Sequence, residues 1–222
     1  MRSYAIAGAL ALLTIPAHAY YHYVHFGSRN APFNPQYEKF AGKTVTFFVS
    51  DQGPAIFAPN DTFGSLLGQV KQALAAWDSV STSDLRVVFG GLETRNQISN
   101  TPGGDVVFED LPPGLLGMGA PIANGVTIVR STVTLARNTN EGAGPSYYEK
   151  FFTTAVHEVG HALGLQHTWA SSAMSQDVIR NTSRARPLDA DDVAALSVLY
   201  GKANWQARRR SRSRQVNFIA YI

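Results

Sequence analysis

The spacing of apolar side chains along the chain predicts a mixture of helices and strands. Four segments rich in β-branched and aromatic residues predict strands, at residues 43–50, 85–91, 105–109 and 126–135. Apolar side chains then recur at helical spacing in a stretch that Asp61 or Thr62 can cap. This first helical face consists of Phe63, Leu66, Leu67, Val70, Leu74 and Trp77.

Two further helices are predicted from their end signals. Ser146 and Glu149 match a capping box, and the helix they begin runs to Leu163, where Gly164 ends it. Asp189 caps a last helix, with Asp191 and Asp192 in its first turn, where the helix dipole favours acidic side chains. This helix ends at Tyr200, with Gly201 in the C′ position. Loops are expected at 27–42, 51–60 and 136–145, with irregular chain at 165–187.

The N-terminus has the pattern of a secretory signal peptide. Arg2 supplies a positive charge, an apolar segment follows at residues 4–15, and Ala17-His18-Ala19 offers a cleavage site after Ala19. The alternative is an uncleaved membrane anchor, although the apolar segment is short for a span. Residues 20–42 would then form an N-terminal arm. Its first residues are aromatic, and His22 and His25 are either packed aromatics or metal ligands.

Composition narrows the chemistry. The 222 residues contain no cysteine, which excludes a disulfide framework, thiolate ligands and a thiol latch on a metal. The positive net charge comes from the C-terminus: residues 202–222 contain six basic residues and no acidic ones, whereas residues 20–200 contain 12 basic and 16 acidic ones. We therefore expect no nucleic-acid-binding domain, and no membrane-spanning segment outside the N-terminus. The basic tail is predicted to be a disordered, solvated segment, or alternatively an electrostatic tether to an anionic surface.

The predicted helix at 146–163 contains the strongest chemical signal, HEVGHALGLQH from residue 157. His157 and His161 are four residues apart and share one helix face, so both imidazoles can reach one ion. Glu158 points about 100° away, where it can reach a water on the metal but not the metal itself. Gly164 permits a sharp turn that returns His167 as a third ligand. Three imidazoles and one water make an open, catalytic zinc site, with Glu158 as general base.

HExxHxxGxxH followed by a methionine resembles the metzincin pattern, and Met174 occupies the position of the methionine turn. Residues 188–201 are similar to the closing helix of the matrixin branch. The resemblance implies a secreted zinc endopeptidase of the α+β class. It implies a zincin/metzincin fold with a twisted mixed sheet of about five strands, one of them an antiparallel edge strand, beside an active-site helix and a C-terminal helix. Residues 114–122 would be the edge strand that pairs with an extended substrate, and Met174 an apolar floor beneath the zinc.

Several positions depart from the family pattern. Thr168 stands where matrixins usually have serine, and Gln176 stands where some metzincins place a tyrosine ligand. Residues 92–145 contain no histidine, so a structural zinc site of the animal matrixins is not expected. Calcium is common in the family, and Asp105, Glu109 and Asp110 are either its ligands or exposed loop carboxylates.

The sequence thus predicts one catalytic domain at 43–201, between a signal peptide at 1–19 with its arm at 20–42 and a basic tail at 202–222. The mature protein is expected to be a monomer that acts on protein or peptide substrates outside the cell, or in the periplasm of a bacterium. One alternative is a secreted zinc-binding module without catalysis, which the intact Glu158 disfavours. Another is a different zinc hydrolase, which the spacing of Gly164, His167 and Met174 disfavours.

Overall fold

The computed structural model describes residues 20–25, 36–94, 102–140, 147–176 and 182–202. The expected signal peptide, most of the basic tail and the capping residue Ser146 lie outside these residues. Within them, no helix is long and apolar enough to cross a membrane.

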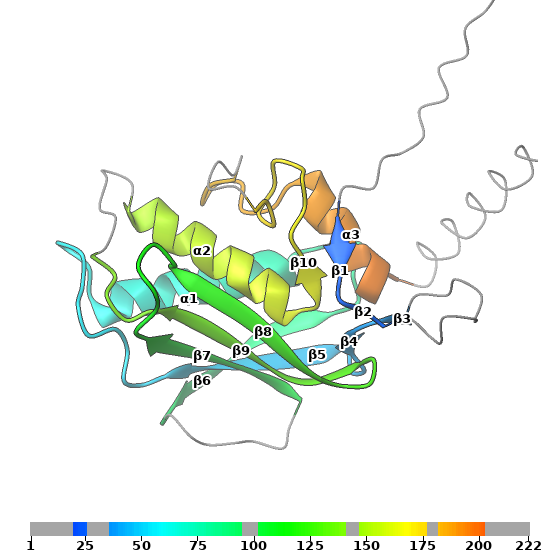
Figure 1. Ribbon diagram of the computed structural model, residues 1–222, viewed down its shortest axis with the longest axis horizontal. Helices are drawn as coiled ribbons and strands as arrows, with labels where there is room; N and C mark the ends of the chain where they lie inside the picture. The colour runs from blue at the N-terminus through cyan, green and yellow to red at the C-terminus, as the bar shows by residue number, and fades with distance from the viewer. Residues whose placement is uncertain (1–19, 26–35, 95–101, 141–146, 177–181, 203–222) are drawn as a thin grey trace, which may run out of the picture.

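A mostly parallel sheet forms the body of the molecule (Figure 1). Four parallel strands stand in the order β9-β7-β5-β6, and β8 pairs with the other side of β9 in antiparallel orientation. The short strand β4, Lys39–Phe40, runs parallel to the beginning of β9. The five longer strands are β5 (Thr44–Ser50), β6 (Arg86–Glu93), β7 (Gly103–Glu109), β8 (Gly117–Asn124) and β9 (Thr127–Ala136).

Three helices complete the described part of the chain: α1 (Phe63–Asp78), α2 (Tyr147–Ala162) and α3 (Ala190–Tyr200). Helices α1 and α2 lie side by side along one face of the sheet (Figure 1). The core lies between these layers. Trp77 of α1 is fully buried there, and its indole N–H donates to the carbonyl of Val156 on α2 at 2.9 Å. The two helices are therefore joined by a directional bond as well as by apolar contact.

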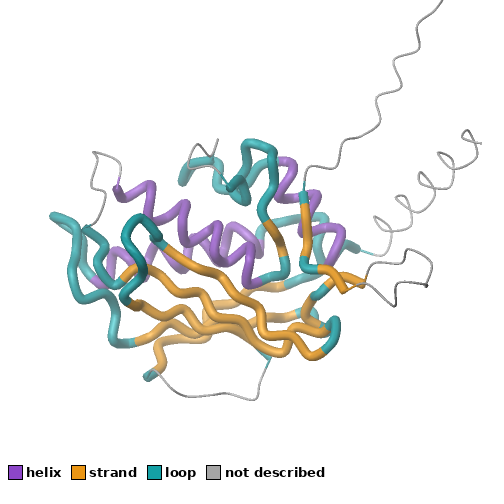
Figure 2. Tube along the Cα trace, viewed as in Figure 1, coloured by secondary structure: helices purple, strands orange, loops and turns teal. Residues whose placement is uncertain are grey.

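The N-terminal arm is built into the fold through strands of two residues each (Figure 2). Strand β1 (Tyr21–His22) pairs antiparallel with β10 (Leu165–Gln166), and β2 (Val24–His25) pairs with β3 (Gln36–Tyr37). The loop expected at 27–42 is thus wrong for β3 and β4. These dipeptides lack the length that a strand pattern needs, so only their tertiary partners define them.

The helix ends match the sequence expectations in part. Thr62 caps α1, exchanging hydrogen bonds with Ser65, and Asp189 caps α3. Helix α3 ends at Tyr200 and is followed by Gly201 as expected, but the φ of −64° and ψ of 149° at Gly201 are extended and not left-handed. Gly201 instead continues as extended chain and bridges to Ser83, so a β contact and not a glycine turn ends this helix.

Candidate metal centre

The three histidines of the motif meet at one point. The Nε2 atoms of His157 and His161 are 3.1 Å apart, and the Nε2 of His167 lies 3.2 Å and 3.1 Å from them. His157 and His161 are buried on α2, whereas His167 is exposed. In the described residues this is the one cluster of His, Asp and Glu with the spacing of a metal site.

The hydrogen bonds of the rings decide which nitrogens face one another. The Nδ1 of His157 lies 2.6 Å from the carbonyl of Ala173, and the Nδ1 of His161 lies 2.8 Å from the carbonyl of Leu165. A carbonyl only accepts, so each Nδ1 donates and each Nε2 of a neutral ring keeps its lone pair. Facing lone pairs repel unless a cation lies between them. Two ligands of a tetrahedral zinc with bonds of 2.0–2.1 Å are about 3.3 Å apart, so the cluster fits zinc.

The turn after α2 returns the third histidine, as expected. Gly164 has a φ of +99°, and a Cβ built there would lie 2.6 Å from the carbonyl oxygen of Glu38. Any other residue would therefore be strained in backbone and in contact. Strand β10 occupies the two positions between this glycine and His167.

Donors from distant elements satisfy the carbonyls at the end of α2. The hydroxyl of Ser131 donates to the carbonyl of Ala162 at 2.7 Å, and the buried hydroxyl of Tyr200 donates to Leu163 at 2.9 Å. The backbone N–H of Tyr23 donates to Gly164 at 3.3 Å. A helix end leaves such carbonyls without intrahelical partners, so these three bonds fix where the helix stops and the turn begins. Sequence reasoning missed all three donors, since no local pattern marks them.

The side chain of Glu158 projects from α2 toward β8. It is buried, and a Cβ placed on Gly117 of β8 would lie 2.6 Å from its Cγ. The charge of the Glu158 carboxylate also acts on the phenol of Tyr23. Burial raises the pKa of Tyr23, the carboxylates of Glu38 and Glu158 raise it further, and a hydrogen bond from the Gln166 side chain lowers it.

Met174 packs against α2 at Gly160, one position before His161. Its side chain is 2% exposed, and its Sδ would lie 2.3 Å from a Cβ placed on Gly160. Its carbonyl accepts from the N–H of Thr168 at 2.9 Å, next to the third histidine. Met174 therefore joins the interior of the helix to the segment that follows His167.

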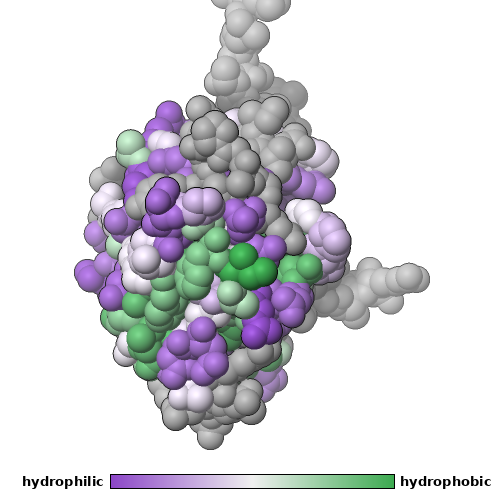
Figure 3. Space-filling view, turned by 90° about the vertical axis from the view of Figure 1, so that its left-hand side faces the viewer, coloured by the Kyte–Doolittle hydropathy of each residue, from purple (hydrophilic) through white to green (hydrophobic). Residues whose placement is uncertain are grey.

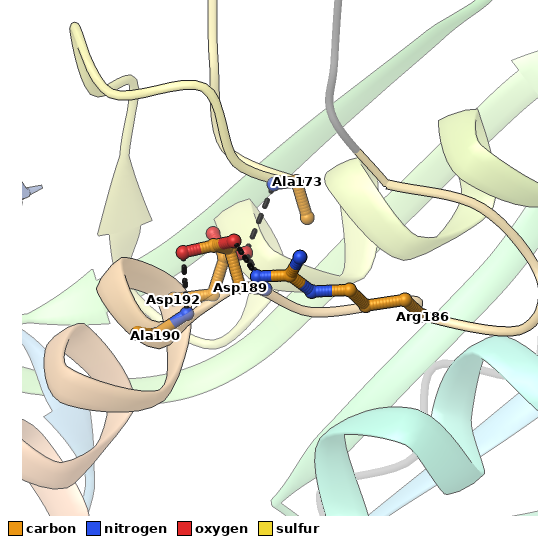
Figure 4. Close-up of polar contacts among 5 residues, drawn as sticks. All are labelled: Ala173, Arg186, Asp189, Ala190 and Asp192. Carbon is orange, nitrogen blue, oxygen red and sulfur yellow. Dashed lines mark hydrogen bonds and ion pairs between the residues drawn. The ribbon is translucent and has the colours of Figure 1, made fainter.

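Asp192 of α3 holds the turn that contains Met174 (Figure 4). Its buried carboxylate accepts from the N–H groups of Ala173 at 2.9 Å, Met174 at 3.1 Å and Asp189 at 2.8 Å. Burial raises the pKa of Asp192, and these hydrogen bonds lower it. Because the carbonyl of Ala173 accepts from His157, the carboxylate orients a ligand through one peptide unit. The sequence marked Asp192 only as a first-turn acid.

The remaining candidates are engaged elsewhere. Asp105 is hydrogen-bonded to Arg130, and the exposed Asp110 lies 3.7 Å from Arg137, so neither belongs to a calcium cluster among the described residues. His22 is a packed aromatic: its ring contacts Tyr20 and Tyr37, and its Nε2 lies 3.0 Å from the carbonyl of Ala195. The side chain of His25 lies outside the described part of the chain.

Comparison with protein families matches residues 39–201 to the matrixins, the peptidase family M10. The chain belongs to the matrixin family. The match contains the three histidines, Glu158 and Met174, and it begins four residues before the boundary expected at 43. Matrixins hold a catalytic zinc, and the histidine cluster fits that ion.

Similar proteins include a hatching enzyme of Paracentrotus lividus, 28% identical over 60% of this chain and 22% of that protein. Matrix metalloproteinase-20 of Homo sapiens is 28% identical over 77% of this chain and 33% of that protein. The chain therefore spans a third or less of the length of these relatives. A solved structure titled "GM1 bound form of the ECX AB5 holotoxin" matches with a TM-score of 0.47 at 14% identity, covering 75% of this chain and 85% of that one.

Proposed function

We propose that this matrixin is a secreted endopeptidase that hydrolyses peptide bonds of protein substrates, with His157, His161 and His167 as zinc ligands and Glu158 as general base. The observation that supports it best is the convergence of three Nε2 atoms at 3.1–3.2 Å, two of them from a helix that also presents Glu158 and one from the segment after it. Three ligands on a partly exposed site leave a coordination position for water or substrate.

When bound, zinc would act as a Lewis acid that lowers the pKa of a water and polarises the peptide carbonyl. The protein does the rest. The Glu158 carboxylate takes a proton from the attacking water and passes it to the departing amine. Its burial between α2 and β8 keeps solvent from competing for that proton. The carbonyls of Ala173 and Leu165 accept from the Nδ1–H groups of His157 and His161, which fixes the two rings and makes each Nε2 a stronger donor to a metal.

The substrate would lie along β8. Among the described strands, β8 pairs with β9 alone, so its other edge can accept an extended peptide by β-augmentation. Gly119 brings this strand against the helix: a Cβ there would lie 2.2 Å from the carbonyl of Glu158 and 2.7 Å from the Cβ of His161. A peptide paired with β8 would therefore run past the metal ligands.

The second candidate is a zinc-binding module without catalysis. It needs the same histidines but gives no role to Glu158, whose side chain is held at the site by α2 and β8. We further propose that the protein acts as a monomer outside the cell, with one catalytic zinc.

The two candidates separate in one experiment. Purified protein should contain about one zinc and digest casein, and 1,10-phenanthroline should abolish digestion until zinc is restored. Glu158→Ala should retain zinc, because Glu158 is not a ligand, and lose roughly 10²–10⁴-fold in kcat. His161→Ala, as the matched control, should lose the metal as well. Wild-type turnover by Glu158→Ala would remove the general base from the mechanism. Zinc-loaded protein that cleaves no peptide would favour the binding module.

A further inference from the structure

The N-terminal arm contacts the chain segment that joins the second and third histidines. Strand β1 pairs with β10 in a register that sets Tyr21 opposite Gln166 and His22 opposite Leu165. Strand β10 is two residues long, and an isolated pair of residues does not hold an extended conformation in water. Its conformation decides where His167 lies, so its sheet partner matters to the site.

Tyr23, the residue after β1, reaches both ends of β10. Its backbone N–H donates to the carbonyl of Gly164 at 3.3 Å, before the strand. Its phenol is hydrogen-bonded to the side chain of Gln166, the residue that precedes His167. One residue of the arm thus spans the glycine turn and the approach to the third ligand.

The arm is itself fixed to the body of the protein. The Nε2 of the buried His22 bonds to the carbonyl of Ala195 on α3 at 3.0 Å, and the carbonyl of Tyr23 accepts from the N–H of Glu38 at 2.9 Å. Strand β10, the partner of the arm, also contacts the second ligand: the carbonyl of Leu165 accepts from the Nδ1 of His161. A docked arm can therefore resist displacement of both His161 and His167.

We infer that residues 20–25 form a clasp that retains the metal, with Tyr23 as the positioning residue that holds Gln166 and thereby His167. This inference rests on the proposed zinc site. The family match begins at residue 39, so the clasp lies outside the part of the chain that the family shares. Groups that orient metal ligands by hydrogen bonds, without binding the metal themselves, typically affect metal affinity by roughly 10–100-fold.

The test uses the full chain and measures release of zinc into an excess of a chromogenic chelator. Tyr23→Phe removes only the hydroxyl, and Gln166→Met removes only the amide. Each should speed zinc release by roughly 10-fold or more, and the double variant should be no faster than the faster single variant, because both lose one shared bond. Tyr21→Phe, two residues before Tyr23 and about half exposed, should match wild type.

Two further measurements separate this role from others. The metal-free variants should melt like metal-free wild type, and at saturating zinc Tyr23→Phe should keep its kcat for a peptide. Zinc release by Tyr23→Phe within about twofold of wild type, or multiplying effects in the double variant, would overturn the clasp. A lower kcat with unchanged zinc release would also overturn it and assign Tyr23 to the substrate instead. If wild type retains zinc but cleaves nothing, the proposed peptidase fails while the release rates still decide the clasp.

Discussion

Glu93 is a carboxyl group whose surroundings favour its neutral form. It lies at the end of β6, and its Oε1 is 3.9 Å from the guanidinium of Arg130, which is itself hydrogen-bonded to Asp105. Burial raises the pKa of Glu93 to about 7, with a hydrogen bond to Asp105 and the charge of Asp105 acting in the same direction and Arg130 acting against them. Two carboxyl groups therefore share one cation, and one of them holds a proton near neutrality.

This proton makes stability depend on pH. The pKa of Glu93 is about 7 in the folded protein and near 4.5 when unfolded. Between those values the folded state binds more protons than the unfolded state, so stability falls as pH rises through this window. Glu93→Gln should remove that decline. Urea denaturation of the metal-free protein from pH 5 to pH 8 should show a smaller loss of unfolding free energy in Glu93→Gln than in wild type.

Asp110→Asn provides the control, because its carboxyl is 86% exposed and its contact with Arg137 at 3.7 Å is weak. Its pH dependence should follow that of wild type. Parallel pH profiles for Glu93→Gln and wild type would show that Glu93 is ionised alike in the folded and unfolded chain.

At the scale of elements, α3 supports the metal centre from a distance through Asp192. Asp192→Ala would leave the N–H groups of Ala173, Met174 and Asp189 without their acceptor. Each unsatisfied buried donor costs about 1–3 kcal/mol, and water can recover part of that. We expect the metal-free variant to lose roughly 2–5 kcal/mol of unfolding free energy in urea, and zinc to dissociate faster because His157 loses its support.

Asp84→Ala is the matched substitution at the surface, where the carboxylate forms an ion pair with Lys43 at 3.5 Å between exposed side chains. It should cost less than about 1 kcal/mol. Equal losses in the two variants would mean that the turn containing Met174 is held by its apolar contacts alone.

The elements were predictable where their own side chains determine them. The strand at 43–50 and the helix capped by Asp189 follow from patterns inside each segment, and both were confirmed. The histidine cluster was predictable for the same reason, since HExxHxxGxxH sets the helix face and the turn within a few residues. The role of Asp192 was not, because a first-turn acid has the same pattern whether it faces solvent or three N–H groups.

The short strands show the other limit of sequence reasoning. Leu165 and Gln166 form a strand only because Tyr21 and His22 lie beside them, and the two pairs are more than 140 positions apart in the chain. Ser131 and Tyr200 likewise reach the end of α2 from β9 and α3. Contacts of this kind depend on the assembled fold, so the spacing of apolar residues in either partner does not predict them.

At the scale of the whole molecule, several large apolar side chains of the described residues are exposed to solvent. Figure 3 shows a band of apolar residues crossing one face between hydrophilic ones. On β8, Met118 and Ile122 are 50% and 54% exposed, and Trp169, two residues after His167, is 81% exposed. Their positions on the proposed substrate strand and beside the third ligand suit contact with the side chains of a bound peptide.

The contacts at the C-terminal end of the domain bear on the domain boundary expected at residue 201. The last described contacts are the bridge of Gly201 to Ser83 and the bond from the N–H of Lys202 to the carbonyl of Thr82 at 3.1 Å. The family match also ends at residue 201. Protein ending at Lys202 retains both contacts, together with the bond from Tyr200 to Leu163 at the end of α2.

We therefore expect this shortened protein to melt at the temperature of the full chain, to hold one zinc and to cleave peptides at the same rate. The basic residues it lacks lie in residues 203–222, outside the described part of the chain. The tether interpretation of this tail predicts that their charge acts on anionic partners and not on the fold. The full chain should consequently bind a heparin column and elute with salt, whereas the shortened protein should pass through. Precipitation or loss of zinc on shortening would place the domain boundary beyond Lys202, and equal retention of the two proteins would dismiss the tether.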